Sequence, residues 1–126
     1  MKFYIASSFK NIERVKYVSE KLIAKGYTQT YDWTKNNRAS TIDQLRHIGQ
    51  KEKDAVCEAD FLVVLFPAGK GSHVELGIAL GRGKKVYLYS ESEDINDFET
   101  TTTFYHLNGI EKCIGTIDDL IRLVSA

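Results

Sequence analysis

The stretch FLVVLFPAGKGSHVELG, residues 61–77, decides the fold of this chain. Its first six residues, 61–66, are an unbroken apolar run of strand length, which predicts a central strand covered on both faces. The loop PAGKG follows at 67–71, and a helical pattern runs from Ser72 to Gly81. A buried strand, a glycine-rich turn and a helix in this order are typical of a parallel α/β sheet.

The same alternation continues on both sides of this stretch. Strands are predicted at 2–6, at 27–33 near the sheet edge, at 85–89 and at 110–114. Further helices are predicted at about 11–25, 40–59 and 116–125, with a long loop over 90–108. We therefore expect an α/β fold with a doubly wound, mainly parallel five-stranded sheet and helices on both faces, flavodoxin-like or Rossmann-like, in the strand order 2-1-3-4-5.

Length and charge limit the classes of partner. The 126 residues have the size of one domain, 1–126, which can bury a core of its own. Seventeen basic residues balance seventeen acidic ones without a basic face, so we expect neither a nucleic-acid polymer nor a membrane as partner. Without a signal-peptide pattern or a long apolar stretch, we expect a cytoplasmic protein. Cys57 and Cys113 lack metal-ligand spacing and are expected to be buried free thiols, with no metal and no cofactor.

Ligands of such sheets bind where the strand order reverses, at the C-terminal ends of the first and third strands. Glycines before a helix leave backbone N–H groups for an anion, and lysine and serine side chains add donors, so the loop predicts a phosphate site. A Walker A loop is excluded, because Lys70 is followed by glycine rather than Ser or Thr. The candidate binding residues are Ser7, Ser8, Gly69, Lys70, Gly71 and Ser72.

Two carboxylates are candidates for chemistry, and each has a structural alternative. Glu75 lies three residues after Ser72, which also fits a capping box in which Glu75 only bonds the start of its own helix. Glu52 continues the apolar stripe of helix 40–59, formed by Leu45, Ile48, Ala55, Val56 and Ala59, unless it extends to water near the helix end. If both point inward, their repulsion would raise the pKa of one and leave the other ionised.

Other residues near this edge give weaker signals. Tyr4 fits core packing, but its hydroxyl could orient a carboxylate. His73 is two residues from Glu75 and therefore on another helix face, so a solvent-facing or phosphate-contacting role is expected for it. The aromatic residues of YDWT at 31–34 could stack on a base or pack on a helix.

Three motifs resemble the nucleoside 2-deoxyribosyltransferase superfamily, which includes the 2′-deoxynucleoside 5′-phosphate N-hydrolases. They are YIAS at 4–7, EAD at 58–60 and GSHVELG at 71–77, and the likeness covers about residues 1–90. The resemblance implies that Glu75 is the nucleophile and that Tyr4 orients it. It also implies that Glu52, eight positions before Asp60, helps protonate the departing base, where the family usually has Asp.

The resemblance also bears on the substrate and the assembly. Transferases of free nucleosides carry an Asp six residues before the nucleophile; Gly69 stands there, which counts against that activity and leaves room for a phosphate. We expect cleavage or transfer of the N-glycosidic bond of a nucleoside 5′-monophosphate or nucleoside; the alternative is a non-catalytic nucleotide-binding or sensor domain. We expect a homodimer or higher homo-oligomer, because the resemblance implies a dimer whose partner supplies a polar residue to the pocket. The long segment over 90–108, with four threonines at 100–103, could close over a neighbour's site, and Thr102 or Thr103 is the candidate for that residue.

Overall fold

A five-stranded parallel sheet with the order β2-β1-β3-β4-β5 is the centre of the computed structural model, which describes residues 1–126. The predicted strand order is confirmed, and β3 lies in the middle with all five residues buried. Its central place follows from its sequence, because only a strand covered on both faces can bury five consecutive apolar side chains. The strands are β1 Lys2–Ala6, β2 Thr28–Gln29, β3 Phe61–Leu65, β4 Lys85–Ser90 and β5 Ile110–Ile114.

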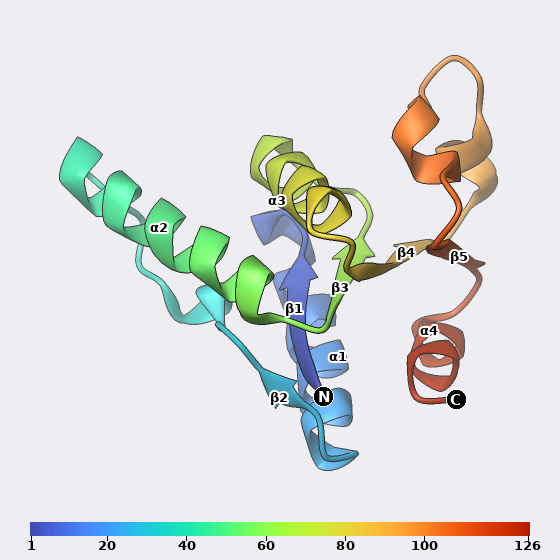
Figure 1. The fold of residues 1–126 in the computed structure, drawn as a ribbon, viewed down its shortest axis with the longest axis horizontal. Coiled ribbons are helices and arrows are strands. Elements are labelled where there is room, and N and C mark those ends of the chain that lie inside the picture. The colour runs from blue at the N-terminus through green and yellow to red at the C-terminus, as the bar shows by residue number, and fades with distance from the viewer.

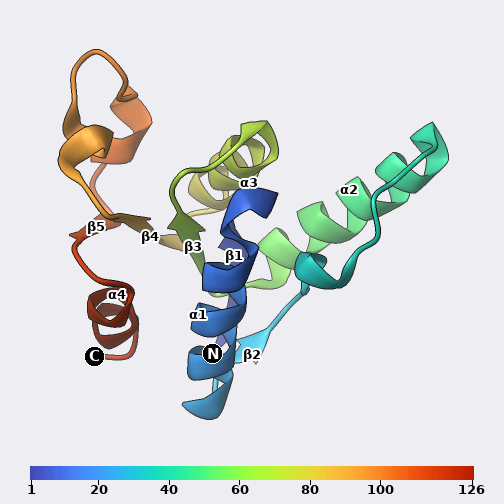
Figure 2. The same cartoon turned by 180° about the vertical axis from the view of Figure 1, so that it is seen from behind.

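Two helices cover each face of the sheet. The helices are α1 Ile12–Ala24, α2 Ile42–Glu58, α3 Lys70–Gly81 and α4 Ile117–Val124. α2 and α3 pack together on one face and α1 and α4 on the other, with β1, β3 and β4 between the layers (Figures 1 and 2). The predicted doubly wound architecture is therefore confirmed. No helix combines the length and the apolar character needed to cross a membrane.

The edge strand is much shorter than its alternating sequence predicts. The prediction of a strand over 27–33 is wrong beyond Thr28–Gln29, the two residues of β2, because the chain then forms a 3₁₀ turn at Trp33–Lys35. The Asp32 carboxylate accepts hydrogen bonds from the Thr34 N–H and hydroxyl, which stabilises the turn locally. The Trp33 indole N–H then donates to the Ile5 carbonyl at 2.7 Å, where a longer β2 would have paired with β1.

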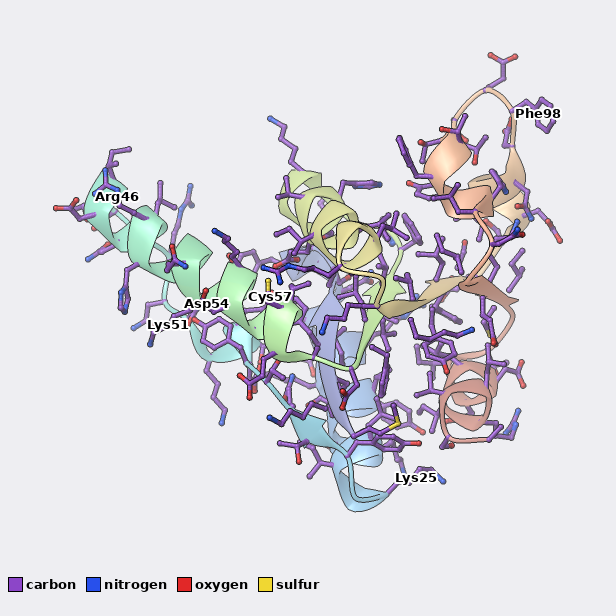
Figure 3. All side chains as sticks on the ribbon, in the orientation of Figure 1. Lys25, Arg46, Lys51, Asp54, Cys57 and Phe98 are labelled. Atoms are coloured by element: carbon purple, nitrogen blue, oxygen red, sulfur yellow. The ribbon has the colours of Figure 1, made fainter.

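The apolar stripe of α2 is buried only at the C-terminal end of the helix. Ala55 and Val56 are buried, but Leu45 is 56% exposed and Ile48 is half-buried, so the expectation that the whole stripe faces the core is wrong. The reason is geometric: the N-terminal half of α2 extends past the sheet, and Arg46 lies far from the body of the protein (Figures 1 and 3).

The segment after β4 is more ordered than the predicted loop. It contains 3₁₀ turns at Glu93–Asn96 and Thr103–His106 and buries Ile95 and Tyr105. Both cysteines are free, with Cys113 buried and Cys57 only half-buried, so the expected burial holds for one of the two.

Candidate active site

The Tyr4 hydroxyl lies between the two carboxylates singled out by the sequence. Tyr4 points toward the α2 and α3 face of the sheet, and its hydroxyl donates to Glu75 Oε2 at 2.5 Å. Glu52 Oε2 is 3.5 Å from the same hydroxyl, at the limit of a hydrogen bond, so the bond to Glu75 dominates. Residues from β1, α2 and α3 thus meet at one point, separated by 48 and 71 positions in the sequence.

Glu75 is held inside the protein and does not cap its own helix. α3 begins at Lys70 with Gly69 as the N-cap, so Ser72 lies within the first turn and the Ser72–Glu75 capping box is not formed. Instead, the Ser72 hydroxyl accepts a long bond from the Gly69 N–H at 3.4 Å. Glu75 is 8% exposed, and its carboxyl accepts the hydrogen bond from the Tyr4 hydroxyl. Glu52 is half-buried and points inward.

Burial dominates the electrostatics of the pair. It raises the pKa of Glu75 to about 8, against the opposing effect of the Tyr4 hydrogen bond and with a further increase from the Glu52 charge. Burial also raises the pKa of Glu52 above its usual range, again opposed by Tyr4. Both pKa values therefore move upward, instead of one rising alone. The pKa of Tyr4 is raised as well, chiefly by burial and then by the Glu75 charge, so the phenol stays protonated and donates.

The two serines after β1 link the loops of the switch point. Ser7 donates to the Leu65 carbonyl at 2.8 Å and Ser8 to the Pro67 carbonyl at 3.2 Å. The buried Asn11 amide joins them, donating to Ser7 Oγ and to the Pro67 carbonyl, each at 3.2 Å. The hydroxyl hydrogens of Ser7 and Ser8 are thus already engaged. Asn11 was missed because its place before α1 resembles a helix cap, a role its side chain does not take.

The start of α3 is open on the side of the loop. Lys70 and Gly71 are exposed, and a Cβ atom built on Gly69 or Gly71 would meet no atom within 4 Å. The first N–H groups of a helix have no carbonyl partner within the helix, so donors are present beside this open space. Ser72, by contrast, is buried.

The remaining candidates lie apart from the carboxylates. The His73 ring contacts the Gly69 carbonyl through Nδ1 at 2.8 Å and the Tyr105 hydroxyl through Nε2 at 2.7 Å. Thr102 caps the 3₁₀ turn at Thr103–His106 and borders an apolar groove along α3, and neither threonine bonds to Tyr4, Glu52 or Glu75. No cluster of three His, Cys, Asp or Glu side chains is arranged to hold a metal ion.

One aromatic residue at this edge was not identified from the sequence. Phe9 is 66% exposed just after Ser8, and it packs edge-on against the buried Trp33 with ring centroids 5.3 Å apart. Trp33 itself is bonded to the Ile5 carbonyl and is therefore a packing residue. An exposed phenyl ring at the C-terminal end of β1 is the feature that a stacking interaction needs.

Two carboxyl groups beside a buried hydroxyl, at the reversal point of a doubly wound sheet, have the composition of a glycosidic-bond site. Residues 3–110 match the family described as nucleoside 2-deoxyribosyltransferase. The match covers most of the chain, and the protein belongs to this family. It supports the general activity expected from the sequence, transfer or cleavage of the glycosidic bond of a nucleoside or nucleotide.

Solved structures share the fold at low sequence identity. The CMP N-glycosidase BcmB of Clostridium botulinum superposes with a TM-score of 0.67 at 20% identity, covering 99% of this chain and 98% of its own. A conserved protein from Enterococcus faecalis V583 gives a TM-score of 0.68 at 17% identity, covering 99% and 97%. No curated protein shows a significant sequence match to the chain.

Proposed function

We propose that this protein cleaves the N-glycosidic bond of a nucleoside 5′-monophosphate, with Glu75 as the nucleophile and Glu52 as the proton donor. The observation that carries the proposal is the Tyr4 hydroxyl with both carboxylates within 3.5 Å. Family membership supports the class of reaction, and the similar fold of a CMP N-glycosidase is consistent with a nucleotide substrate.

The mechanism has two steps. The Glu75 carboxylate attacks the anomeric carbon as the bond to the base breaks, and the Glu52 carboxyl gives its proton to the leaving nitrogen. Glu52, now ionised, takes a proton from water, whose oxygen attacks the same carbon and releases the sugar phosphate and the Glu75 carboxylate. Tyr4 holds one oxygen of Glu75, so that the other is free to attack.

The protonation of the pair decides when this mechanism can run. The reactive form has Glu75 ionised and Glu52 protonated, whereas in the empty site burial raises the pKa of Glu75 to about 8. The positive charge that develops on the sugar favours the ionised form of Glu75, while burial raises the pKa of Glu52 above its usual range and favours its protonated form. The hydrogen bond from Tyr4 also favours the ionised form of Glu75.

The phosphate is assigned to the start of α3. Gly69 and Gly71 leave open space there, the first helical N–H groups are donors, and Lys70 is an exposed cation. Ser72 is bonded to Gly69 and contributes through its N–H, while Ser7 and Ser8 contribute by fixing the two loops. Phe9 supplies an exposed ring for the base at the same end of the sheet.

A binding-only function is the second candidate, and one observation favours it. Glu75 is largely protonated at neutral pH in the empty site because of its raised pKa, and a protonated carboxyl is not a nucleophile. A nucleotide sensor would use the same loop and leave the glycosidic bond intact.

One experiment separates the two functions. The protein is incubated with nucleoside monophosphates, nucleosides and NAD, and free base is measured by chromatography. We expect base release from a monophosphate, a loss of about 10³-fold or more in Glu75→Gln, and no change in Glu20→Gln, an exposed residue of α1. Retained turnover in Glu75→Gln would exclude Glu75 as nucleophile, and ligand binding without base release would identify a sensor.

A further inference from the structure

One buried polar side chain bridges the two loops that meet at the reversal point of the sheet. Asn11 is 9% exposed and ends the 3₁₀ turn Phe9–Asn11, immediately before α1. An asparagine at this position usually caps the following helix with its side chain, but Asn11 makes no such bond. Its amide instead donates to Ser7 Oγ and to the Pro67 carbonyl, 56 positions away, each at 3.2 Å. The side chain therefore joins the loops after β1 and β3 and leaves its own helix uncapped.

The two partners fix the direction in which the amide of Asn11 points. The Pro67 carbonyl can only accept a hydrogen bond, and Ser7 already gives its hydroxyl hydrogen to the Leu65 carbonyl at 2.8 Å. Both partners thus present acceptors, and only the NH₂ group of Asn11 can satisfy them. The contact requires two donors on one short side chain. Neither an ionised aspartate nor an apolar residue of the same size provides them.

The bond to Pro67 sets where the chain enters α3. The next anchored carbonyl is that of Gly69, the N-cap of α3, which accepts from the His73 backbone N–H at 3.2 Å and contacts the His73 ring at 2.8 Å. One residue separates these two anchors, so a displacement of Pro67 is passed on to the first turn of the helix. The N–H groups of that turn are the donors available to an anion.

A different contact positions the catalytic carboxylate. Glu75 is held by the Tyr4 hydroxyl at 2.5 Å, and neither of these residues bonds to Asn11 or Pro67. A hydrogen bond from an N–H group to a phosphate oxygen needs a distance of about 2.7–3.2 Å, so a shift of about 1 Å at the start of α3 is enough to lose it. Phosphate binding can therefore be disturbed while the carboxylate stays in place.

We propose that Asn11 is a positioning residue for phosphate recognition, whose two bonds hold residues 66–69 so that the first N–H groups of α3 face the phosphate of the substrate. Asn11 itself does not touch the substrate. The inference rests on the proposed function, because it takes the start of α3 as the phosphate site. It adds a residue whose loss removes the preference for a nucleotide and leaves the chemistry at Glu75 intact.

Steady-state kinetics of base release, from a nucleoside monophosphate and from its nucleoside, test the proposal on the full chain. Asn11→Leu keeps the approximate size of the side chain and has no donor. We expect its KM for the monophosphate to rise about tenfold while kcat stays within about twofold of the wild type. The KM for the nucleoside should change by less than about twofold. Asn11→Asp, which has the same shape and cannot donate when ionised, should show the same split and replaces Asn11→Leu if that variant does not fold by circular dichroism.

Ser19→Ala is the matched control. Ser19 is a buried polar residue of α1, 6% exposed, and its hydroxyl donates to Gln29 at 2.7 Å, away from both loops. Its loss should lower the Tm, as the loss of Asn11 does, because each removes a buried hydrogen bond. The ratio of the two KM values should stay that of the wild type in Ser19→Ala and fall only in the Asn11 variants.

Two results would overturn the proposal, and they differ in what they say about the proposed function. A kcat that falls with both substrates at an unchanged KM ratio, in Asn11→Leu or Asn11→Asp, would make Asn11 a structural residue and leave the phosphate site standing. A wild type that shows no preference for the monophosphate would remove the phosphate site and this role of Asn11 together. Base release by the wild type, measured in the same assay, tests the reaction separately.

Discussion

The carboxyl group of Glu75 is buried beside a second carboxyl, and this makes folding stability depend on pH. Its pKa is raised from 4.5 to about 8 in the folded protein, so the folded state holds this proton more tightly than the unfolded chain does. The stabilisation from the protonated form is complete below about pH 4.5 and is lost as pH rises through 8. The ionised form of Glu75, which the proposed mechanism needs, therefore lowers the free energy of unfolding.

Replacing Glu75 by glutamine should therefore stabilise the protein at high pH. The neutral amide still accepts the Tyr4 hydrogen bond and cannot ionise. We expect equal unfolding free energies near pH 4.5, and a variant more stable by about 2–4 kcal/mol at pH 9. Urea unfolding at both pH values measures this, with Glu20→Gln as the exposed control. Parallel stability profiles for the wild type and Glu75→Gln would contradict the raised pKa.

The sequence identified this carboxylate without deciding its role. The spacing from Ser72 to Glu75 fits a cap and a buried site equally, and the choice depends on Tyr4, which lies 71 positions away. Glu52 lies on an apolar stripe, which favoured an inward position but left open that its side chain reaches water; the 3.5 Å contact with the Tyr4 hydroxyl decides this. Asn11 and the His73–Tyr105 pair were not predicted, since their bonds join loops that the sequence does not place side by side.

At the scale of elements, the continuous apolar run predicted its strand correctly, whereas the alternating pattern predicted a longer strand than the structure contains. β3 could be placed at the centre because nothing else accommodates five buried apolar residues in a row. Residues 27–33 alternate well, but after Thr30, whose N–H still donates to the Phe3 carbonyl, the local Asp32 cap and the Trp33 indole bond replace strand pairing. Edge strands have one neighbour only, so side-chain interactions compete with them more easily than with a central strand.

The N-terminus of α3 carries the prediction for the phosphate. A nucleoside monophosphate should bind at least tenfold more tightly than its nucleoside, a difference of about 1.4 kcal/mol. Lys70→Ala should remove much of this difference and leave the nucleoside affinity nearly unchanged, because Lys70 is exposed and makes no other bond. Calorimetry of Glu75→Gln at moderate salt avoids turnover, and Lys16→Ala on α1 is the matched control. Equal affinities for the two ligands would show that the loop is not a phosphate site.

At the scale of the whole molecule, α2 is the least supported element. Its N-terminal half leaves the sheet, with Ile42 69% exposed and Leu45 56% exposed. A helical segment without tertiary packing is only marginally stable in water. Neighbouring exposed apolar residues on one helix indicate an interface. Glu52 on the same helix is only half-buried, so the candidate active site is also open to solvent on this side. A second copy of the chain would pack against the exposed half of α2 and cover Glu52. We expect this copy to contribute Thr102 or Thr103 as a polar residue of the pocket.

We therefore expect a homo-oligomer held through α2. Sedimentation velocity at micromolar concentration should give at least twice the chain mass of 14.3 kDa. Leu45→Ser combined with Ile42→Ser should shift the protein to monomer, and base release should fall with it, because the neighbour no longer completes the pocket. Ile23→Ser changes a 50% exposed residue of α1 on the opposite face and should change neither the mass nor base release.

Mixing two inactive variants tests whether Thr102 acts across the interface. A mixture of the Thr102→Val and Glu75→Gln proteins should recover part of the base release that each variant alone has lost, because one site of a mixed dimer then holds both intact residues. A wild-type monomer with full activity would contradict the interface, and so would a double variant that stays oligomeric.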